Sequence, residues 1–243
     1  MHCHILPGVD DGAESINEAI ELLKMEYEDG VRTICLTPHF RMRMFETSRE
    51  DVQKQFEKLQ KETSERFPDL RLELGCEFHS CMDILEFLDR DNRYTMGNSR
   101  WVLLEFSGVH DERWIRERCS DLLYHGYTPI IAHAERYPAL YRKYDTIEQL
   151  IDMGAFIQIN ADSILGKDGF GRKLFCKKLM KMDFIHFIGS DAHDPHHRKP
   201  MMGKCAKYLT KIMGEEYARR ILAENPQKLM EMGEDYGSES AKR

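Results

Sequence analysis

The chain alternates short β-rich runs with amphipathic segments of helical period, and this alternation constrains its fold more than any other feature. The β-rich runs cover residues 31–37, 70–76, 101–106, 128–132, 155–160 and 184–189, and residues 1–5 form a shorter candidate. Strands that are separated by helices pair as parallel neighbours, with the helices as crossovers. The sequence therefore predicts an α/β fold built on parallel strands.

The clearest helical segments carry capping residues at their start. Ser15 and Glu18 form a capping box, and Gly30 follows the end of that segment. A second segment begins near Ser48, and a third covers residues 111–126. These signals predict three helices, each with one apolar face toward the sheet.

The length selects among parallel folds. The chain's 243 residues are close to the roughly 250 of a barrel of βα units, so a closed or distorted barrel is the first prediction and an open doubly wound sheet the second. The open sheet lacks support, because Leu174 stands where a third glycine would follow Gly169 and Gly171 in a phosphate loop. We expect residues 1–232 to form one domain and residues 233–243 a disordered tail.

The composition argues against several classes of protein. The 42 acidic and 35 basic residues give a net charge of −7, which does not fit a general nucleic-acid-binding protein. No apolar stretch approaches the roughly 20 residues of a membrane span, and the start of the chain does not resemble a secretory signal. Seven cysteines without a C-x-x-C pair indicate a cytoplasmic protein. An oligomer is compatible with the sequence.

Side chains that bind metals stand at the C-terminal end of nearly every predicted strand. They are His2, His4, Asp11, His39, Glu77, Glu105, His133, Asp191 and His193. In a parallel barrel these strand ends share one mouth, where the chemistry takes place. A single histidine or carboxylate in such a place is more often a loop residue or a helix cap, but the joint pattern predicts a shared metal site.

The ligand types suit Mn²⁺, Fe²⁺ or Zn²⁺, because imidazole and carboxylate are present without thiolate. Nine ligands are enough for two or three ions. Three divalent ions with four carboxylates and a bridging hydroxide would carry a net charge of about +1, attract a phosphate dianion and supply the nucleophile. This predicts metal-assisted phosphoester hydrolysis. Arg136 and Arg198 follow ligands closely in the sequence, and we predict that they bind phosphate and stabilise the transition state.

The motifs occur in an order that resembles a known family. They are H-x-H, D-D-G, T-x-H-F, G-x-E, L-E-F, I-A-H-x-E-R-Y and S-D-x-H. This set is similar to the PHP (polymerase and histidinol phosphatase) superfamily, and specifically to the bacterial manganese-dependent protein-tyrosine phosphatases of the CpsB/CapC type. The resemblance covers essentially the whole chain, including MFET at residues 44–47 and ENPQKLM at residues 224–230.

The resemblance implies a distorted (β/α)₇ barrel with three metals at its mouth, Mn²⁺ first and Fe, Zn or Mg as alternatives. One metal would be held by His2, His4, Glu77 and Asp191, a second by Glu77, Glu105 and His133, and the third by Asp11, His39 and His193. Arg136 and Arg198 fall on the family's phosphate-binding and catalytic positions. The family removes phosphate from tyrosines, typically in the tail of a bacterial tyrosine kinase that governs capsule or exopolysaccharide assembly.

Two segments carry expectations of their own. Only Met1 precedes the H-x-H motif, where relatives have several hydrophobic residues, so either the start is truncated or the first strand pairs weakly. A weakly paired strand would hold His2 and His4 loosely.

Residues 40–45 (FRMRMF) are basic and aromatic directly after a ligand. We predict that Arg41 and Arg43 grip an acidic, tyrosine-bearing peptide; the alternative is a solvated loop.

Other functions stay open on the sequence alone. Cys35 and Arg41 match the C-x5-R motif of cysteine-dependent phosphatases, but Pro38 lacks the N–H that a phosphate loop needs, and Cys35 lies inside an apolar run. A small-molecule phosphatase of the histidinol-phosphate type or a phosphodiesterase would use the same metals. A non-catalytic domain that the ions merely stabilise is a further alternative.

Overall fold

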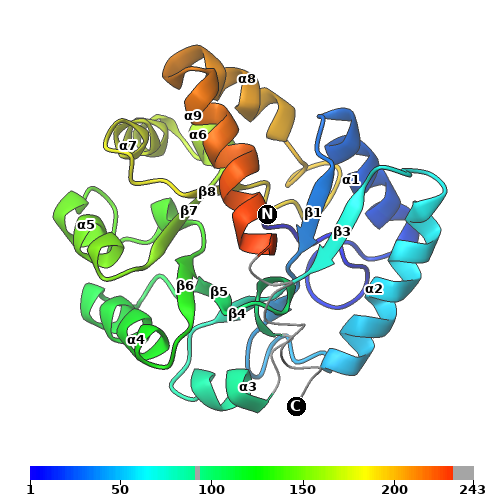
Figure 1. Ribbon diagram of the computed structural model, residues 1–243, viewed down its shortest axis with the longest axis horizontal. Helices are drawn as coiled ribbons and strands as arrows, with labels where there is room; N and C mark the ends of the chain where they lie inside the picture. The colour runs from blue at the N-terminus through cyan, green and yellow to red at the C-terminus, as the bar shows by residue number, and fades with distance from the viewer. Residues whose placement is uncertain (91–93, 232–243) are drawn as a thin grey trace.

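The computed structural model describes residues 1–90 and 94–231, and the predicted tail at 233–243 lies outside them. Parallel strands curl around a common centre, and helices cover them from outside (Figure 1). A six-stranded sheet has the order β2 (His39–Phe40), β4 (Glu77–His79), β5 (Trp101–Glu105), β6 (Thr128–Ile131), β7 (Phe156–Asn160) and β8 (Phe187–Gly189). Beside it, β1 (Thr33–Leu36) pairs in parallel with β3 (Arg71–Leu74). The predicted α/β class with parallel strands is confirmed.

Two of the predicted strands are each followed by a short second strand that the sequence did not predict. Pro38 separates β1 from β2, and it cannot donate a backbone hydrogen bond to a neighbouring strand. Gly75 separates β3 from β4, and a Cβ there would lie 2.9 Å from the Met96 sulfur. The breaks place His39 opposite Glu77 in register, so these two ligands begin short second strands instead of following long ones.

Residues 1–5 do not form a regular strand, yet backbone hydrogen bonds hold them on both sides. The Thr37 N–H donates to the Cys3 carbonyl at 2.9 Å, and the His4 N–H donates to the Ala192 carbonyl at 2.8 Å. His2 and His4 are 0% exposed. The segment therefore lies between the ends of β1 and β8, and the expectation that it would be loosely held is wrong, because its neighbours bury it.

The three predicted helices are present with their expected caps. They are α1 (Ile16–Glu28), α2 (Arg49–Ser64) and α4 (Glu112–Tyr124). The side chains of Ser15, Ser48 and Asp111 each accept a hydrogen bond from the backbone N–H three residues later. Such a cap contributes about 1 kcal/mol. Further helices are α3 (Ile84–Arg90), α5 (Tyr144–Asp152), α6 (Ala161–Leu165), α7 (Phe170–Lys181), α8 (Met202–Met213) and α9 (Glu215–Arg219). The short 3₁₀ helices are η2 (Met96–Asn98) and η3 (Ala134–Arg136), and η4 (Arg220–Glu224) is a π-helix.

The strands bury both of their faces, as parallel strands under helices do. On β5, Val102 and Leu104 pack in the cluster that includes Ile115 and Leu122 of α4, whereas Leu103 belongs to an inner cluster with Phe187 of β8. Because side chains fill this interior, the polar chemistry is confined to the mouth where the strands end.

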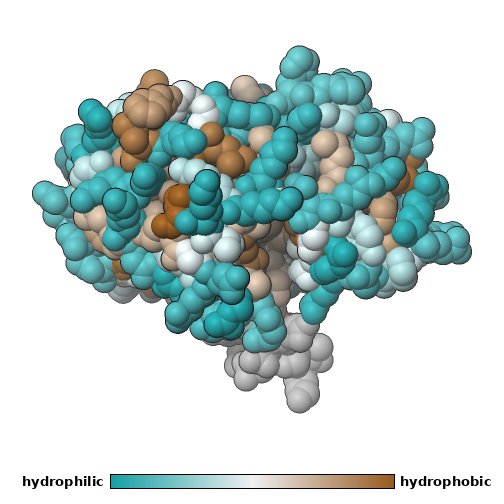
Figure 2. Space-filling view, turned by 90° about the horizontal axis from the view of Figure 1, so that it is seen from above, coloured by the Kyte–Doolittle hydropathy of each residue, from teal (hydrophilic) through white to brown (hydrophobic). Residues whose placement is uncertain are grey.

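The outer surface is mostly polar. On the face shown in Figure 2, hydrophilic residues predominate and apolar ones gather in small groups. Within residues 1–90 and 94–231, no helix has the length and apolar character that crossing a membrane demands.

Candidate metal centre

Glu77 stands at the centre of the predicted ligands. Its Oε2 lies 3.2 Å from His2 Nε2, 3.1 Å from His4 Nε2 and 3.0 Å from His39 Nδ1. Its Oε1 lies 2.8 Å from His133 Nε2. One fully buried carboxylate therefore contacts four imidazoles that come from three separate parts of the chain.

Asp191 forms a second focus, directly after β8. Its Oδ1 lies 3.6 Å from the Nε2 atoms of both His2 and His4, and 3.7 Å from His193 Nδ1. The Nε2 atoms of His2 and His4 are 3.2 Å apart. Two imidazole nitrogens that face each other across a carboxylate are an arrangement that a shared cation would stabilise.

Asp11 and Glu105 extend the centre toward its opening. Asp11 Oδ1 lies 3.6 Å from the Nε2 atoms of both His39 and His193. The Glu105 carboxylate lies 3.9 Å from His39 Nδ1 and 3.9 Å from His133 Nε2. All of the predicted ligands thus lie in one connected cluster.

Three groups of side chains offer ligand atoms within 4.8 Å of one another. The groups are His4, Asp11, His39 and His193; His2, His4 and Glu77; and His39, Glu77 and Glu105. The first contains the set that the resemblance assigned to the third metal, with His4 added. The second lacks Asp191, and the third has His39 in place of His133, although Asp191 and His133 lie beside them.

Buried atoms without a hydrogen-bond partner test whether the cluster fits a metal. They are Glu77 Oε2, Glu105 Oε2, His39 Nδ1, His133 Nδ1 and His193 Nε2. The His39 and Glu77 atoms are close to each other but are not aligned for a hydrogen bond. Leaving such an atom unpaired costs about 1–3 kcal/mol, so the donor set fits divalent cations.

Three histidines direct Nε2 into the cluster because their other nitrogen is occupied. His4 Nδ1 bonds to Asp10 Oδ2 at 2.7 Å, and His2 Nδ1 bonds to Gln158 Oε1 at 3.1 Å. His193 Nδ1 bonds to the backbone carbonyl of Asp191 at 2.9 Å. Partners of this kind fix the ring orientation and the tautomer of a metal-binding histidine.

Asp10 was not predicted as part of the site, although it precedes Asp11 in the D-D-G turn. It accepts the His4 bond and also bonds from the backbone N–H groups of His39 and Gly12. Burial opposes its ionisation, but the charge and hydrogen bond of His4 lower its pKa to about 2. Gly12 allows the turn to close, because a Cβ there would lie 1.9 Å from the His4 carbonyl oxygen.

Gln158 and Asn160 on β7 are further residues that the sequence reading missed. Gln158 Oε1 also accepts the His133 N–H at 2.7 Å, and Asn160 Nδ2 donates to Asp191 Oδ2 at 2.7 Å. The available signal was a pair of buried amides at alternate positions of an otherwise apolar strand.

Arg136 and Arg198 both contact the carboxylate of Asp191. Arg136 Nη1 lies 3.0 Å and Arg198 Nη2 2.9 Å from Asp191 Oδ2. Asp162 and Asp168 also contact the Arg136 guanidinium, at 3.5 Å and 3.4 Å. Burial opposes ionisation of Asp191, but His2 and Arg198 hold its pKa well below the usual range.

Two further proposed ligands, Glu105 and His133, have pKa values raised by their surroundings. Burial, together with the charge of Glu77, raises the pKa of Glu105 to about 7. Burial disfavours protonation of His133, yet its hydrogen bond to Glu77 raises its pKa to about 9. The crowded carboxylates therefore favour positive charge in their midst, which protons or metal ions can supply.

Two of the proposed ligands have a strained backbone. His133 has φ 31° and Asp191 has φ 50°, both in the left-handed region that disfavours residues other than glycine. Each such residue costs on the order of 1–3 kcal/mol and persists where the surroundings fix it. Gln158 fixes the His133 N–H, and the His2 carbonyl accepts the Asp191 N–H.

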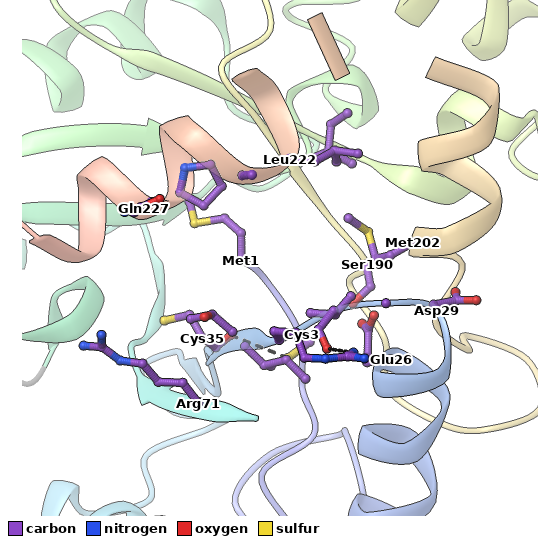
Figure 3. A pocket seen from close by; sticks show the side chains of 18 of the residues that line it. Met1, Cys3, Glu26, Asp29, Cys35, Arg71, Ser190, Met202, Leu222 and Gln227 are labelled. Carbon is purple, nitrogen blue, oxygen red and sulfur yellow. Dashed lines mark hydrogen bonds between the residues drawn. The ribbon is translucent and has the colours of Figure 1, made fainter. Parts of the chain in front are cut away.

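A cavity of about 420 Å³ opens over the cluster. Its lining includes Asp11, His39, Arg41, Met44, Phe45, Glu77, Glu105, Phe106, His133, Arg136, Tyr137, Asp191 and Arg198. A larger cavity of about 720 Å³ lies elsewhere, between the segment of Met1 and Cys3 and the helix of Leu222 and Gln227 (Figure 3). None of the predicted ligands lines it, so we place the chemistry in the smaller cavity.

Cys35 does not support the thiolate alternative. Its side chain is 2% exposed in the inner cluster, and it lines the larger cavity away from the ligands. Burial raises the pKa of its thiol to about 12. A nucleophilic cysteine needs the opposite shift.

The chain is similar to known proteins over nearly its full length. The family described as "Capsular polysaccharide synthesis, CpsB/CapC" matches residues 1–231. "Tyrosine-protein phosphatase CpsB" of Streptococcus pneumoniae is 36% identical over 235 residues, which are 95% of this chain and 97% of that protein. "Tyrosine-protein phosphatase YwqE" of Bacillus subtilis (strain 168) is 30% identical over 230 residues, covering 95% and 90%.

Solved structures agree with the sequence comparison. A structure described as belonging to YwqE from Bacillus subtilis and CpsB from Streptococcus pneumoniae, "unique metal-dependent tyrosine phosphatases", superposes with a TM-score of 0.86 at 29% identity, covering 95% of this chain and 93% of that chain. Histidinol phosphate phosphatase from Lactococcus lactis shares the fold alone, with a TM-score of 0.55 at 15% identity and coverage of 91% and 93%. The predicted distorted barrel of the PHP type is confirmed, and the chain belongs to the CpsB/CapC family.

Proposed function

We propose that this chain is a metal-dependent phosphoric monoester hydrolase that removes phosphate from phosphotyrosine in proteins. The observation that carries the proposal is the convergence of histidines and carboxylates on Glu77 and Asp191, with two arginines on the second oxygen of Asp191, Oδ2. The names of the relatives CpsB and YwqE support the same activity.

Divalent ions in this cluster would be held by His2, His4, Asp11, His39, Glu77, Glu105, His133, Asp191 and His193. When bound, they would supply Lewis-acid activation of water and neutralise phosphoryl oxygens. Mn²⁺ is the ion we infer, two or three per chain, because hard carboxylates and imidazoles without thiolate suit it. Fe²⁺, Zn²⁺ and Mg²⁺ are the alternatives that metal analysis would distinguish.

Asp191 divides its carboxylate between the two parts of the site. Its Oδ1 faces the imidazoles, and its Oδ2 holds Arg136 and Arg198. The guanidinium groups are therefore fixed beside the ligand cluster before substrate arrives. Their planar forks match phosphoryl oxygens, and they stabilise the negative charge that spreads over the phosphoryl group in the transition state.

The phenol leaving group of phosphotyrosine needs less help from a proton donor than an alkyl alcohol would. A phenol has a pKa of about 10, so its oxygen leaves without a strong proton donor. We therefore assign no residue as general acid. The partner we infer is a phosphotyrosine segment, such as the tail of a bacterial tyrosine kinase in capsule or exopolysaccharide assembly, in the cytoplasm.

The proposal is tested by comparing substrates and inhibitors on one purified protein. We expect hydrolysis of a phosphotyrosine peptide, loss of activity after chelation and recovery with Mn²⁺, while histidinol phosphate and single-stranded DNA are poor substrates. Cys35→Ser is the matched control and keeps activity, because Cys35 is buried away from the ligands. Activity that survives chelation but not Cys35→Ser would overturn the metal mechanism, and faster hydrolysis of histidinol phosphate would overturn the substrate.

A further inference from the structure

The segment after β2 folds into a short turn at the rim of the cavity. The Arg41 N–H donates to the Phe45 carbonyl at 2.9 Å, and the Phe45 N–H donates back to the Arg41 carbonyl at 2.8 Å. Arg43 has φ 64°, which lets the chain reverse. Thr47 Oγ1 bonds to the Val9 carbonyl at 2.7 Å and ties the base of the turn to the D-D-G loop.

Some side chains of the turn line the cavity, and others lie outside it. Arg41, Met44 and Phe45 line the cavity over the ligands, whereas Met42 and Arg43 do not. Met44 is 58% exposed and Met42 is 40% exposed. The sequence predicted that Arg41 and Arg43 act together, but only Arg41 lines the cavity.

Phe45 forms one apolar wall of the cavity. Its ring lies parallel to the His39 ring, with centroids 5.3 Å apart and an interplanar angle of 9°. Phe106 and Tyr137, whose ring centroids are 5.7 Å apart, also line the cavity beyond the end of β5.

The cavity that these side chains line has a volume of about 420 Å³, which is within the range of pockets that bind small ligands. Aromatic rings stack with centroids about 4.5–7 Å apart. The cavity therefore offers an aryl ring apolar walls beside the groups that would bind its phosphate.

Arg41 differs from the other arginines of the cavity. Arg136 and Arg198 are paired with Asp191. Across residues 1–90 and 94–231, no carboxylate lies within ion-pair distance of the Arg41 guanidinium, and its side chain is half-buried. Its charge is thus available to an anionic group of the substrate.

We propose that the turn from Arg41 to Phe45 determines substrate specificity: Phe45 and Met44 contact the aryl ring, and Arg41 binds an acidic side chain next to the phosphotyrosine. This inference rests on the proposed function and adds to it the side chains that recognise the aryl ring and an acidic residue beside it. The wall explains why a ring is preferred, because an alkyl phosphate would leave apolar surface in contact with water.

The ring contact is tested by direct binding, which does not depend on turnover. Calorimetric titration of the Mn²⁺-loaded protein with phenylphosphonate and methylphosphonate gives an affinity ratio. We expect Phe45→Leu to lower that ratio about fivefold and Met44→Ala about threefold, from the loss of ring stacking and apolar contact. Met42→Ala is the matched control, since it lies on the same turn outside the cavity.

Because Phe45 stacks on His39, the bound Mn²⁺ of each variant is measured as well. Met44 is largely exposed, so Met44→Ala keeps the test decisive if Phe45→Leu loses metal. Unchanged ratios in both variants with full metal content would overturn the ring contact. Binding of phenylphosphonate without any phosphotyrosine hydrolysis would contradict the proposed function and leave the ring contact standing.

The role of Arg41 is tested with non-hydrolysable phosphotyrosine peptides that carry Glu or Gln beside the phosphorylated residue. We expect Arg41→Gln to lower the Glu-to-Gln affinity ratio about fivefold, and Arg43→Gln to leave it at the wild-type value. High salt should reduce the wild-type ratio in the same direction, because it screens exposed charges. An equal loss of phenylphosphonate affinity in Arg41→Gln would instead assign Arg41 to the phosphoryl group and overturn this role.

Discussion

At the scale of single residues, the centre depends on side chains that orient its ligands as much as on the ligands. The proposed ligands could be named from sequence, because His, Asp and Glu stood where the strands of a barrel end. Asp10 and Gln158 could not, since their roles follow from which ring nitrogen they meet in space. Nothing in D-D-G tells which of the two carboxylates faces His4.

Asp10→Ala should weaken binding of Mn²⁺ by about 10- to 100-fold, the usual effect of removing a carboxylate that orients a metal-binding histidine. The reason is that His4 Nδ1 and the His39 N–H both lose their acceptor. Calorimetric titration of the metal-free protein with Mn²⁺ measures the affinity. Asp69→Ala, at the exposed pair with Tyr27 and Arg32, is the control. Equal affinities of the two variants would contradict the orienting role.

Arg136→Ala should lower kcat/KM for a phosphotyrosine peptide by about 10²–10³-fold, the range found when one preorganised donor to the transition state is removed. The effect is expected in steady-state kinetics at full metal loading. Arg142→Ala, an exposed neighbour that does not line the cavity, should behave as wild type. A similar loss in both variants would mean that Arg136 acts through the stability of its loop.

At the scale of elements, periodicity located β1, β3, β5, β6, β7 and β8 and the three capped helices, because apolar spacing and cap residues are local signals. The short strands β2 and β4 after Pro38 and Gly75 were not predicted, because strands of two and three residues carry no periodic signal and are defined by their pairing with each other. The irregular segment at residues 1–5 is likewise defined by bonds to Thr37 and Ala192, far away in the sequence.

His186 makes the contact between β7 and β8 sensitive to acid. Its Nδ1 accepts the Ile157 N–H at 3.1 Å, so the bond requires a neutral ring. Burial lowers its pKa to about 4, below the ordinary value of about 6.5. The neutral ring's contribution to stability is therefore complete above pH 6.5 and declines as the pH falls toward 4.

We expect the wild type to lose about 1–2 kcal/mol more of its free energy of unfolding between pH 7 and pH 5 than His186→Gln does. Urea unfolding of both proteins at the two pH values measures the difference, and comparison of the two removes the contribution of the other histidines. The same loss in both proteins would show that His186 is not the group responsible.

At the scale of the whole molecule, the barrel has a filled interior and a polar mouth. Cys35, Leu103 and Phe187 occupy the interior, and the ligands lie where the strands end. This arrangement explains why length and strand alternation were enough to predict the fold, whereas the curl that brings His2 beside Asp191 needed the structure. It also places the first and last ligands of the chain in one cluster.

The central claim is that side chains from the N-terminal segment, from the strand ends and from the loop after β8 surround divalent cations. An anomalous difference map, collected at the manganese absorption edge from crystals grown with Mn²⁺, tests it without reference to activity. The account predicts two or three peaks among Glu77, Asp191 and their imidazole neighbours, each about 2.0–2.3 Å from its ligands. A map without peaks at the mouth, or with peaks only elsewhere on the molecule, would contradict it.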